Sequence, residues 1–413
     1  MFGTHRMIYN TLVSKSRTDC FQLAQKDLAA KYRGIAQKHS LANHLPSYHL
    51  EVPEEVMDST YRDFIKAIKT SKALFRSLVK SGKRTTYPNL GFKTLKDNSS
   101  TIEIRSRSIK IPTDGIVRFF PTFLGKDGIV IKETLPDLTC SVRLMRTRLS
   151  EFYLIIPRTR EFEQSNSLKT CAIDPGSRDF ITVYDPSGLV VGITDANRAI
   201  AKRCFHIDRL KAKLSQEVRN RVRKRLKKTI YNIEQRITNM INDCHQKVSK
   251  WLAENYREVL LPKFETSKMT KKENRKIGKQ TTRSMLNWSH YKFKEMLRMK
   301  MERAGGRLID CTEPYTSKTC SACGIVNRKF KAEKTFKCLS CNHTNDRDVN
   351  ASRNIYMMNE HLLTWTLRVQ LMEKPTPWVS GAGDCQAVCV PNKKRLLLPQ
   401  LDDVILVTHD NSH

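Results

Sequence analysis

The stretch that decides the fold reads Glu-Pro-Tyr-Thr-Ser-Lys-Thr-Cys-Ser-Ala-Cys-Gly over residues 313–324 and Cys-Leu-Ser-Cys-Asn-His-Thr-Asn-Asp-Arg-Asp-Val-Asn-Ala-Ser-Arg-Asn over residues 338–354. It contains two Cys-x-x-Cys pairs, with carboxylates on both sides of them. Each pair can present two thiolates from one tight turn, and four thiolates complete a tetrahedral zinc site. The predicted zinc ligands are Cys320, Cys323, Cys338 and Cys341.

The alternative for these four cysteines is two disulfide bonds or four unrelated buried thiols. The chain has twelve cysteines, and the other eight show no framework spacing, which favours a reducing compartment and therefore zinc. Because sulfur fills all four positions, the zinc is expected to be structural. Such a clip folds a short segment without a core of its own and brings the flanking acids towards each other. Catalysis is therefore expected at the acids.

The charge of the chain points to a polyanionic partner. Lys and Arg outnumber Asp and Glu by 74 to 41, and the resulting net charge of +33 is spread along most of the sequence. Nucleic acid is the simplest such partner, and a ribosome-bound or merely soluble basic protein is the alternative. The 413 residues suffice for two or three domains. The sequence has neither a run of about twenty apolar residues nor an apolar leader, so we expect no membrane span.

The first 168 residues change period part-way. Residues 1–85 carry apolar residues at helical spacing, interrupted by basic residues that suit either a solvated face or phosphate contacts. From 86 to 168 the period becomes two, as in Thr-Ile-Glu-Ile-Arg-Ser-Arg-Ser-Ile-Lys-Ile (101–111), and turn-forming residues separate short strands. We expect a small antiparallel sheet or barrel with a basic outer face.

A new unit begins at Cys-Ala-Ile-Asp-Pro-Gly (171–176), where Asp174 ends a short apolar strand and two more strand candidates follow. An acid on the first strand of a three-strand meander is how a ribonuclease-H-like fold opens, although Asp174 taken alone could be a turn residue. Periodicity then predicts a long helical stretch over 196–255, a strand from 259, a helix carrying Trp288, a strand over 307–311 and a helix over 349–358.

Acids recur at strand ends and beside a helix start: Asp174, then Glu265 or Glu313, then Asp348. Carboxylates at one sheet edge can hold two Mg²⁺ ions about 4 Å apart, one activating water and one stabilising the leaving 3′ oxygen of a phosphodiester. Carboxylates suit Mg²⁺ and thiolates suit zinc, so the two sites should not compete. We rank Asp346 below Asp348, because it precedes the helix and can cap it. The pattern predicts a metal-dependent nuclease.

A basic run lies within the long helical stretch. It suits an arm that follows a nucleic-acid backbone, a nuclear-targeting signal or a solvated surface, and the first two can hold together. We favour backbone contact by Arg219, Arg221, Arg223, Lys224, Arg225, Lys227 and Lys228.

Three motifs together resemble the transposon-encoded TnpB nucleases: Asp-Pro-Gly (174–176), Thr-Ser-Lys-Thr-Cys-Ser-Ala-Cys-Gly (316–324) and Asp-Arg-Asp-Val-Asn-Ala-Ser-Arg-Asn-Ile (346–355). The eukaryotic and viral branch called Fanzor is the closer match, and the similarity covers most of residues 2–357. The resemblance implies an RNA-guided DNA endonuclease. A guide RNA encoded near the gene would pair with one strand of a double-stranded DNA target, while the protein checks a short adjacent motif.

The resemblance also implies a multidomain fold of mixed α+β and α/β type, similar to type V CRISPR effectors. Its expected parts are a helical recognition lobe (1–85), a wedge β-barrel (86–168) and a RuvC nuclease core (169–318 and 343–357). A zinc ribbon (319–342) is inserted in the core as a target nucleic-acid-binding element, and a C-terminal tail (358–413) follows. We expect two catalytic Mg²⁺ ions, one structural Zn²⁺ and a monomeric protein in the ribonucleoprotein. A eukaryotic or viral source would place it in the nucleus, another source in the cytoplasm.

Residue by residue, Asp174 matches the first catalytic aspartate of the family and Asp348 the last. TnpB proteins normally have glutamate where this chain has Pro262, and proline cannot bind a metal. A Fanzor-type rearrangement supplies the glutamate from the strand before the ribbon, where Glu313 fits, and Glu265 is the alternative.

A second departure is the short segment before the first helix, where family members usually have a basic strand. Either the first strand of the wedge barrel is absent or the barrel is completed differently, for instance by the C-terminal tail. Together with Pro262 this departure favours the competing reading, a catalytically impaired RNA-guided DNA-binding protein that acts as a repressor or a domesticated transposon remnant. The three matching acids favour the nuclease. A strand-joining transposase is the weakest reading, because the ribbon insertion resembles the nuclease family.

Overall fold

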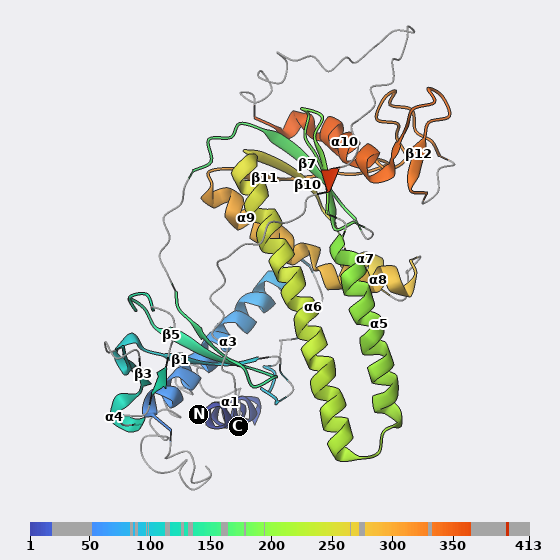
Figure 1. Cartoon of the computed structure of the whole chain (residues 1–413). Helices are drawn as coiled ribbons and strands as arrows, with labels where there is room; N and C mark the ends of the chain where they lie inside the picture. The colour runs from blue at the N-terminus through green and yellow to red at the C-terminus, as the bar shows by residue number, and fades with distance from the viewer. Residues whose placement is uncertain are drawn as a thin grey trace. The chain divides into compact units, whose positions relative to one another are not determined.

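The computed structural model describes residues 1–18, 52–82, 86, 90–95, 97, 99–111, 116–124, 128–130, 135–157, 164–176, 179–193, 195–264, 266–271, 277–328, 333–364 and 394–395 (Figure 1). These residues belong to two compact units, one within 1–160 and the other within 161–402. No helix in these ranges is both long and apolar enough to cross a membrane.

Two helices form one core of the first unit. Helix α1 spans Phe2–Thr18 and α3 spans Glu54–Lys80. Along α3 every fourth residue from Val56 to Ile68 is buried, which is the stripe expected of an amphipathic helix. That stripe includes Phe64, which packs with Leu12 and Val13 of α1 in an apolar cluster. The helical character predicted for the start of the chain is therefore present in the described residues.

The rest of the first unit consists of two three-stranded antiparallel sheets. One contains β1 (Ser99–Ile104), β5 (Val142–Thr147) and β6 (Phe152–Ile155), and the other contains β2 (Ile109–Lys110), β3 (Ile116–Phe119) and β4 (Ile129–Val130). A short helix, α4 (Pro121–Leu124), follows β3. Ile102 and Ile104 of β1 point into the core, as the period of two predicts.

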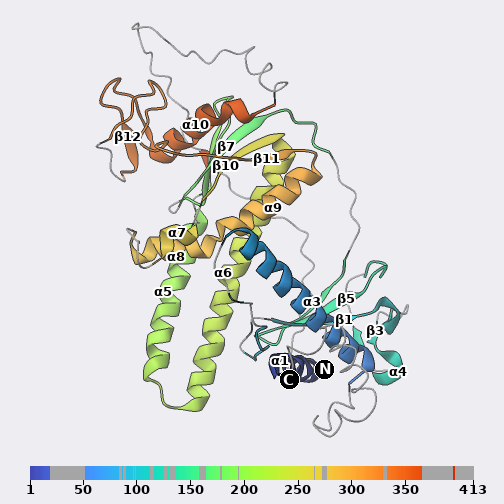
Figure 2. The same cartoon turned by 180° about the vertical axis from the view of Figure 1, so that it is seen from behind.

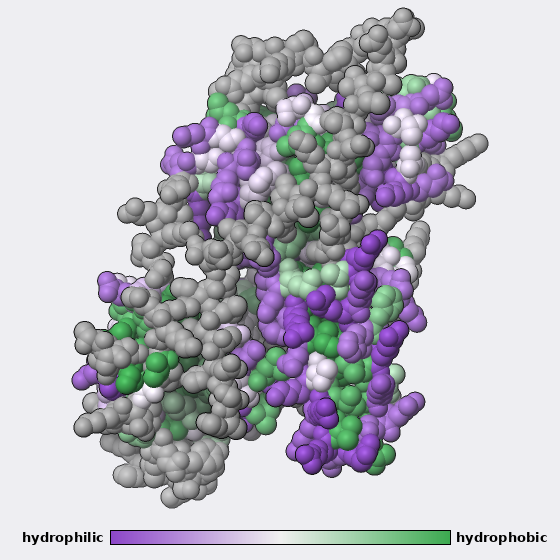
Figure 3. Space-filling model, in the orientation of Figure 1, coloured by the Kyte–Doolittle hydropathy of each residue, from purple (hydrophilic) through white to green (hydrophobic). Residues whose placement is uncertain are grey.

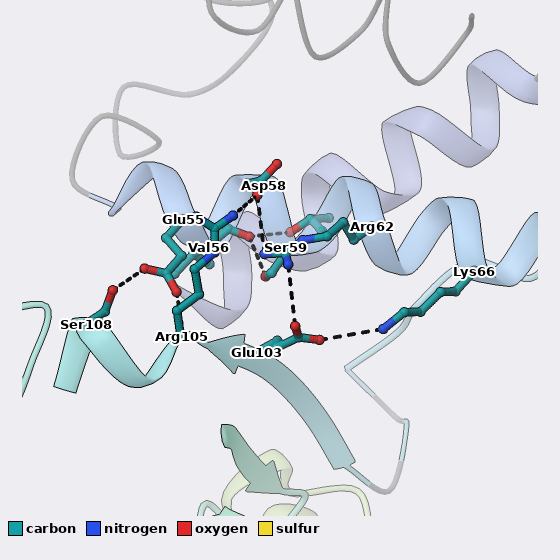
Figure 4. A network of polar contacts seen from close by, with 10 residues as sticks. Glu55, Val56, Asp58, Ser59, Arg62, Lys66, Glu103, Arg105 and Ser108 are labelled. Carbon is teal, nitrogen blue, oxygen red and sulfur yellow. Dashed lines mark hydrogen bonds and ion pairs between the residues drawn. The ribbon is translucent and has the colours of Figure 1, made fainter. Parts of the chain in front are cut away.

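A polar network joins α3 to the end of β1 (Figure 4). The Glu55 carboxylate accepts hydrogen bonds from the Arg105 backbone N–H, at 2.5 Å, and from the Ser108 hydroxyl. The Arg105 guanidinium in turn lies 2.6 Å from Asp58. One turn further along α3, Arg62 pairs with Glu103 of β1. These contacts fix the helix against the sheet that its apolar stripe covers.

The second unit is built on a six-stranded sheet of order β11-β10-β7-β8-β9-β14. The first three strands in sequence, β7 (Thr170–Pro175), β8 (Ile181–Tyr184) and β9 (Val190–Gly192), form an antiparallel meander. Strand β10 (Glu258–Pro262) then lies parallel to β7, and β11 (Arg307–Cys311) lies parallel to β10. A meander followed by two strands parallel to its first strand is the ribonuclease-H-like arrangement. Strand β14 (Lys394–Arg395) pairs with β9 at the far edge.

Helices cover both faces of this sheet (Figures 1 and 2). On one face lie α5 (Asp195–Gln216), α6 (Asn220–Asn255), α8 (Lys279–Trp288) and α9 (His290–Arg303), with the short α7 (Thr266–Thr270) before α8. Their core includes Ile173, Leu261 and Leu297. The opposite face is covered by α10 (Arg347–Asn359), which is followed by one turn of 3-10 helix at Glu360–Leu362.

One predicted helix is in fact two. The sequence pattern around Trp288 predicts a single helix, whereas α8 ends and α9 begins at Ser289, which adopts a left-handed conformation with φ of 48°. Trp288 and His290, on either side of this break, both stack on Phe180. Because both rings must reach the same partner, packing imposes the break without a glycine or proline.

Candidate functional site

The carboxyl ends of β7, β10 and β11 form one edge of the sheet. Ala172 pairs with Leu260, and Leu260 pairs with Ile309. Two residues further along each strand, Asp174 comes level with Pro262, which pairs with Cys311. Residues two apart share a face of a sheet. Since Ala172, Leu260 and Cys311 pack in one cluster with residues of α10, Asp174 belongs to the face that α10 covers.

Glu313 lies close to this edge in sequence. It lies two residues beyond Cys311, just after β11 ends, and its charge acts on the Cys311 thiol. Pro262, on the strand between Asp174 and Cys311, is buried and carries no ligand atom. The last residue of β10 therefore offers no carboxylate at this edge.

The environment of Glu313 is unusual for a carboxylate. Its side chain is partly buried, and in the described part of the chain it has no hydrogen bond or ion pair. Burial disfavours the charged form and raises the pKa of Glu313 to about 7. A divalent cation would supply the missing positive partner, because hard cations bind carboxylate oxygens.

Asp346 and Asp348 have different roles at the start of α10. The Asp346 side chain caps the helix, accepting hydrogen bonds from the backbone N–H of Asp348 at 2.9 Å and of Val349 at 3.4 Å. Asp348 lies in the first turn, and its carboxylate is paired with the adjacent Arg347 at 3.0 Å. Asp346 is therefore committed to the backbone, as its position before the helix predicted.

The four predicted zinc ligands come together. Their Sγ atoms all lie within 4.8 Å of one another, with 3.7 Å between Cys320 and Cys341 and 3.6 Å between Cys323 and Cys338. Zn–S bonds of about 2.3 Å in a tetrahedron give S···S distances of about 3.8 Å. Disulfide bonds, at about 2.05 Å, do not fit these separations. The donor set and its geometry both suit zinc.

The local backbone explains why these cysteines converge. Each Cys-x-x-Cys turn is followed by a residue with positive φ, Gly324 at 75° and Asn342 at 54°. The first turn is closed by the Gly324 N–H donating to the Cys320 carbonyl. Strands β12 (Thr335–Lys337) and β13 (Thr344–Asp346) pair around the second turn, and buried Phe336 packs against the sulfurs.

The second turn also favours thiolate formation. Burial opposes the charged form of Cys338, but the backbone amides of Cys341 and Ser340 and the neighbouring sulfurs outweigh it. The pKa of Cys338 is lowered to about 7. A thiolate is the form that binds zinc.

The predicted basic arm lies at the tip of the hairpin formed by α5 and α6. Arg219 pairs with Glu217. The Arg223 guanidinium donates to the carbonyl of Leu214, in the last turn of α5, and to that of Glu217, just after α5. These two arginines therefore have structural partners. The remaining five side chains are solvent-exposed: Arg221, Lys224, Arg225, Lys227 and Lys228. Hydrophilic side chains line both flanks of the hairpin, with hydrophobic ones between them (Figure 3).

The acids are less tightly assembled than the cysteines. Within the described ranges, the four cysteines are the one group of three or more acidic, histidine or cysteine side chains close enough to share an ion. Asp174, Glu313 and Asp348 are placed at one sheet edge and on the helix that covers it, while Glu265 lies outside the described residues. Three buried asparagines on α10 (Asn350, Asn354 and Asn359) were assigned no role from the sequence, although Asn350 and Asn354 fall in the motif quoted over residues 346–355.

Comparison with known proteins finds a family model and several viral relatives. Residues 290–355 match a family model described as "Cas12f1-like, TNB domain". The chain is 30% identical over 274 residues to the "Putative transposase A625R" of Paramecium bursaria Chlorella virus 1, covering 65% of this chain and 58% of that protein. It is 29% identical over 246 residues to the "TnpB-like protein L79" of Acanthamoeba polyphaga mimivirus, covering 57% and 46%. The chain is therefore similar to TnpB-like proteins and contains a region that matches the Cas12f1-like TNB domain.

Cas12f1 proteins match over a shorter range or at lower identity. Over 79 residues the chain is 34% identical to the "CRISPR-associated endodeoxyribonuclease Cas12f1" of Sulfoacidibacillus thermotolerans, covering 19% of each protein. A solved structure of a Cas12f1–sgRNA–target DNA complex aligns with a TM-score of 0.47 and 15% identity, covering 85% of this chain and 81% of that one. The chain spans about half the length of the curated viral relatives that it matches.

Proposed function

We propose that this TnpB-like protein is an RNA-guided, Mg²⁺-dependent DNA endonuclease of the Fanzor type. The observation that carries the proposal is the sheet edge where Asp174 lies on the face covered by α10, with Glu313 just beyond the end of β11 and Asp348 in the first turn of α10. Carboxylates from two strands and one helix are the donor set that divalent cations take up in phosphodiester hydrolysis.

The residues of the chain divide the work as follows. Asp174, Glu313 and Asp348 would hold two Mg²⁺ ions. When bound, these ions supply activation of the attacking water and stabilisation of the leaving 3′ oxygen. Glu313, just after β11, would supply the acid that is missing where Pro262 occupies the end of β10. The four cysteines would hold one structural Zn²⁺, which fixes the ribbon beside α10.

The basic surface serves the guide and the target. A net charge of +33 suits a protein that contacts mainly the backbones of an RNA guide and a double-stranded DNA target, with the sequence read by base pairing. The five exposed basic residues at the α5–α6 tip would contribute phosphate contacts. Replacing three of them with Gln should reduce the slope of log affinity against log salt by about three. We further propose a monomeric protein that works in the nucleus.

A plasmid cleavage assay tests the proposal. The protein is purified with RNA transcribed from beside its gene, reprogrammed to a target flanked by a randomised motif, and assayed with Mg²⁺. Asp174→Ala and Glu313→Ala should abolish cutting, and Glu265→Ala should not. Asp310→Asn is the matched control, because Asp310 lies on β11, three residues before Glu313, but pairs with Lys294 at 2.5 Å.

A second function, guided DNA binding without cleavage, is favoured by Pro262, since the central strand end lacks an acid. Tight binding of RNA and target without cutting under any metal condition would select it. Cutting that survives both Asp174→Ala and Glu313→Ala would instead show that the chemistry lies elsewhere.

A further inference from the structure

Three buried asparagines on α10 bind the main chain of one distant segment. Asn350, Asn354 and Asn359 are 0%, 4% and 2% exposed. Amides buried this deeply need partners, because an unsatisfied polar group costs free energy. Their partners are concentrated in residues 312–321, the segment that carries Glu313 and the first zinc ligand.

Asn359 holds the start of this segment. Its Oδ1 accepts hydrogen bonds from the Thr312 backbone N–H at 3.2 Å and from the Thr312 hydroxyl at 3.5 Å. Its Nδ2 donates to the Thr312 carbonyl at 2.9 Å and to the Ile355 carbonyl at 2.8 Å. Thr312, the residue before Glu313, is thus bound through both of its backbone polar groups.

Asn354 and Asn350 hold the other end. Asn354 Nδ2 donates to the carbonyls of Thr316 at 2.8 Å and Thr319 at 2.7 Å. Asn350 Nδ2 donates to the same Thr319 carbonyl at 2.7 Å, and its Oδ1 accepts from the Ser321 N–H at 2.8 Å. Ser321 lies inside the first Cys-x-x-Cys turn.

The two ends meet at Glu313. The Thr316 hydroxyl donates to the Glu313 carbonyl at 3.1 Å, so the bonds of Asn354 to Thr316 also restrict Glu313. In the described part of the chain the Glu313 carboxylate itself has no polar partner, so the position of its side chain depends on how its backbone is held. The helix that holds it also carries Asp348.

We propose that Asn350, Asn354 and Asn359 are positioning residues that make the location of Glu313 depend on the zinc-bound state of the ribbon. The inference rests on the proposed function of Glu313. Zinc orders the first Cys-x-x-Cys turn, and this order fixes Thr319 and Ser321 as partners for Asn354 and Asn350. Without zinc those partners move, and Asn359 alone holds the segment. The structural metal would then regulate the carboxylate site from a distance.

Hydrogen exchange tests the link without relying on cleavage. In the zinc-loaded full chain, peptides covering residues 312–316 should exchange slowly. Asn359→Ala removes the acceptor of the Thr312 N–H and should speed exchange there about tenfold. Removing zinc with a chelator should also speed exchange at residues 312–316 in the wild type. In Asn354→Ala, where one of the bonds to the ribbon is already lost, removing zinc should speed exchange by a smaller factor. Asn10→Ala is the matched control, because Asn10 makes the same paired bonds to the Lys93 backbone, at 2.8 and 2.9 Å, in the other unit.

Binding of Mn²⁺, followed by electron paramagnetic resonance, separates this inference from the proposed function. Asp174→Ala should abolish the tight Mn²⁺ site, and Asn359→Ala or loss of zinc should weaken it about tenfold, as expected for partners behind a metal ligand. Mn²⁺ binding that depends on Asp174 but not on zinc or Asn359 would overturn the positioning role and leave the carboxylate site standing. Mn²⁺ binding indifferent to Asp174 would overturn the proposed site itself, and exchange at 312–316 that ignores zinc would overturn the link.

Discussion

Replacing Asp346 should damage folding of α10 rather than chemistry. Asp346→Ala removes the acceptor of two helix N–H groups, those of Asp348 and Val349. A lost cap of this kind costs ~1 kcal/mol, and the lost negative charge at the helix N-terminus adds roughly 0.5 kcal/mol. The free energy of unfolding should therefore fall by about 1–2 kcal/mol. Asp346→Asn keeps an acceptor at the cap and should lose only a few tenths of a kcal/mol, or roughly the charge contribution.

Asp348 should show the opposite pattern. Its carboxylate pairs only with the adjacent Arg347 in the described contacts, so Asp348→Asn should leave thermal unfolding nearly unchanged. Because Asp348 is proposed as a metal ligand, Asp348→Asn should lose more cleavage activity than the roughly tenfold to hundredfold lost when a residue that hydrogen-bonds a metal ligand is replaced. Thermal unfolding followed by circular dichroism and guided plasmid cleavage would be measured on both asparagine variants. The reasoning is refuted if Asp346→Asn is inactive while Asp348→Asn cuts at the wild-type rate.

Three further outcomes are expected. Because burial raises the pKa of Glu313 to about 7, the native state binds an extra proton between about pH 4.5 and 7. Without added divalent ions, the free energy of unfolding should fall over that window as pH rises, and Glu313→Gln should flatten the fall. The affinity for Mn²⁺ should increase from pH 6 to 8. A stability profile that Glu313→Gln leaves unchanged would contradict this. Cys338→Ser should lower the zinc content and the melting temperature together, whereas wild-type zinc content would argue against the four-sulfur site. Gly306→Ala should cost about 1–3 kcal/mol, since its Cβ would meet the Arg257 carbonyl at 2.8 Å, while Gly91→Ala, with open space around it, should melt like the wild type.

Local pattern was enough to predict the strands and the zinc ligands. The strand predicted over 307–311 is β11, and the four cysteines lie as their spacing requires. Such features depend on neighbouring residues, so a sequence read in order contains them. The topology around Asp174 also follows, because a meander of short apolar strands has few ways to pair.

Other features depend on contacts between distant residues, and sequence reading missed them. The partners of Asn359 and Asn354 lie some tens of residues away, and only the fold brings them together. Arg223 fits a phosphate-binding run by composition. Because the turn before α6 is short, its guanidinium instead reaches the carbonyl groups at the end of α5. The break at Ser289 is imposed by stacking on Phe180, which is far away in sequence.

Pro262 marks a position to which the carboxylate of Glu313 could be moved by mutation. Leu260, two residues before Pro262 on β10, packs in the cluster with α10, so a carboxylate at position 262 would lie on the α10 face. A chain with Pro262→Glu and Glu313→Gln would return the acid to the central strand. Glutamate has the backbone N–H that proline lacks, so this exchange removes no hydrogen-bond donor from the sheet. Recovery of activity in this double variant, after its loss in Glu313→Gln alone, would mean that the sheet edge tolerates more than one distribution of the same charges. Nuclease domains of this topology could then be redesigned by exchanging ligands between adjacent strands.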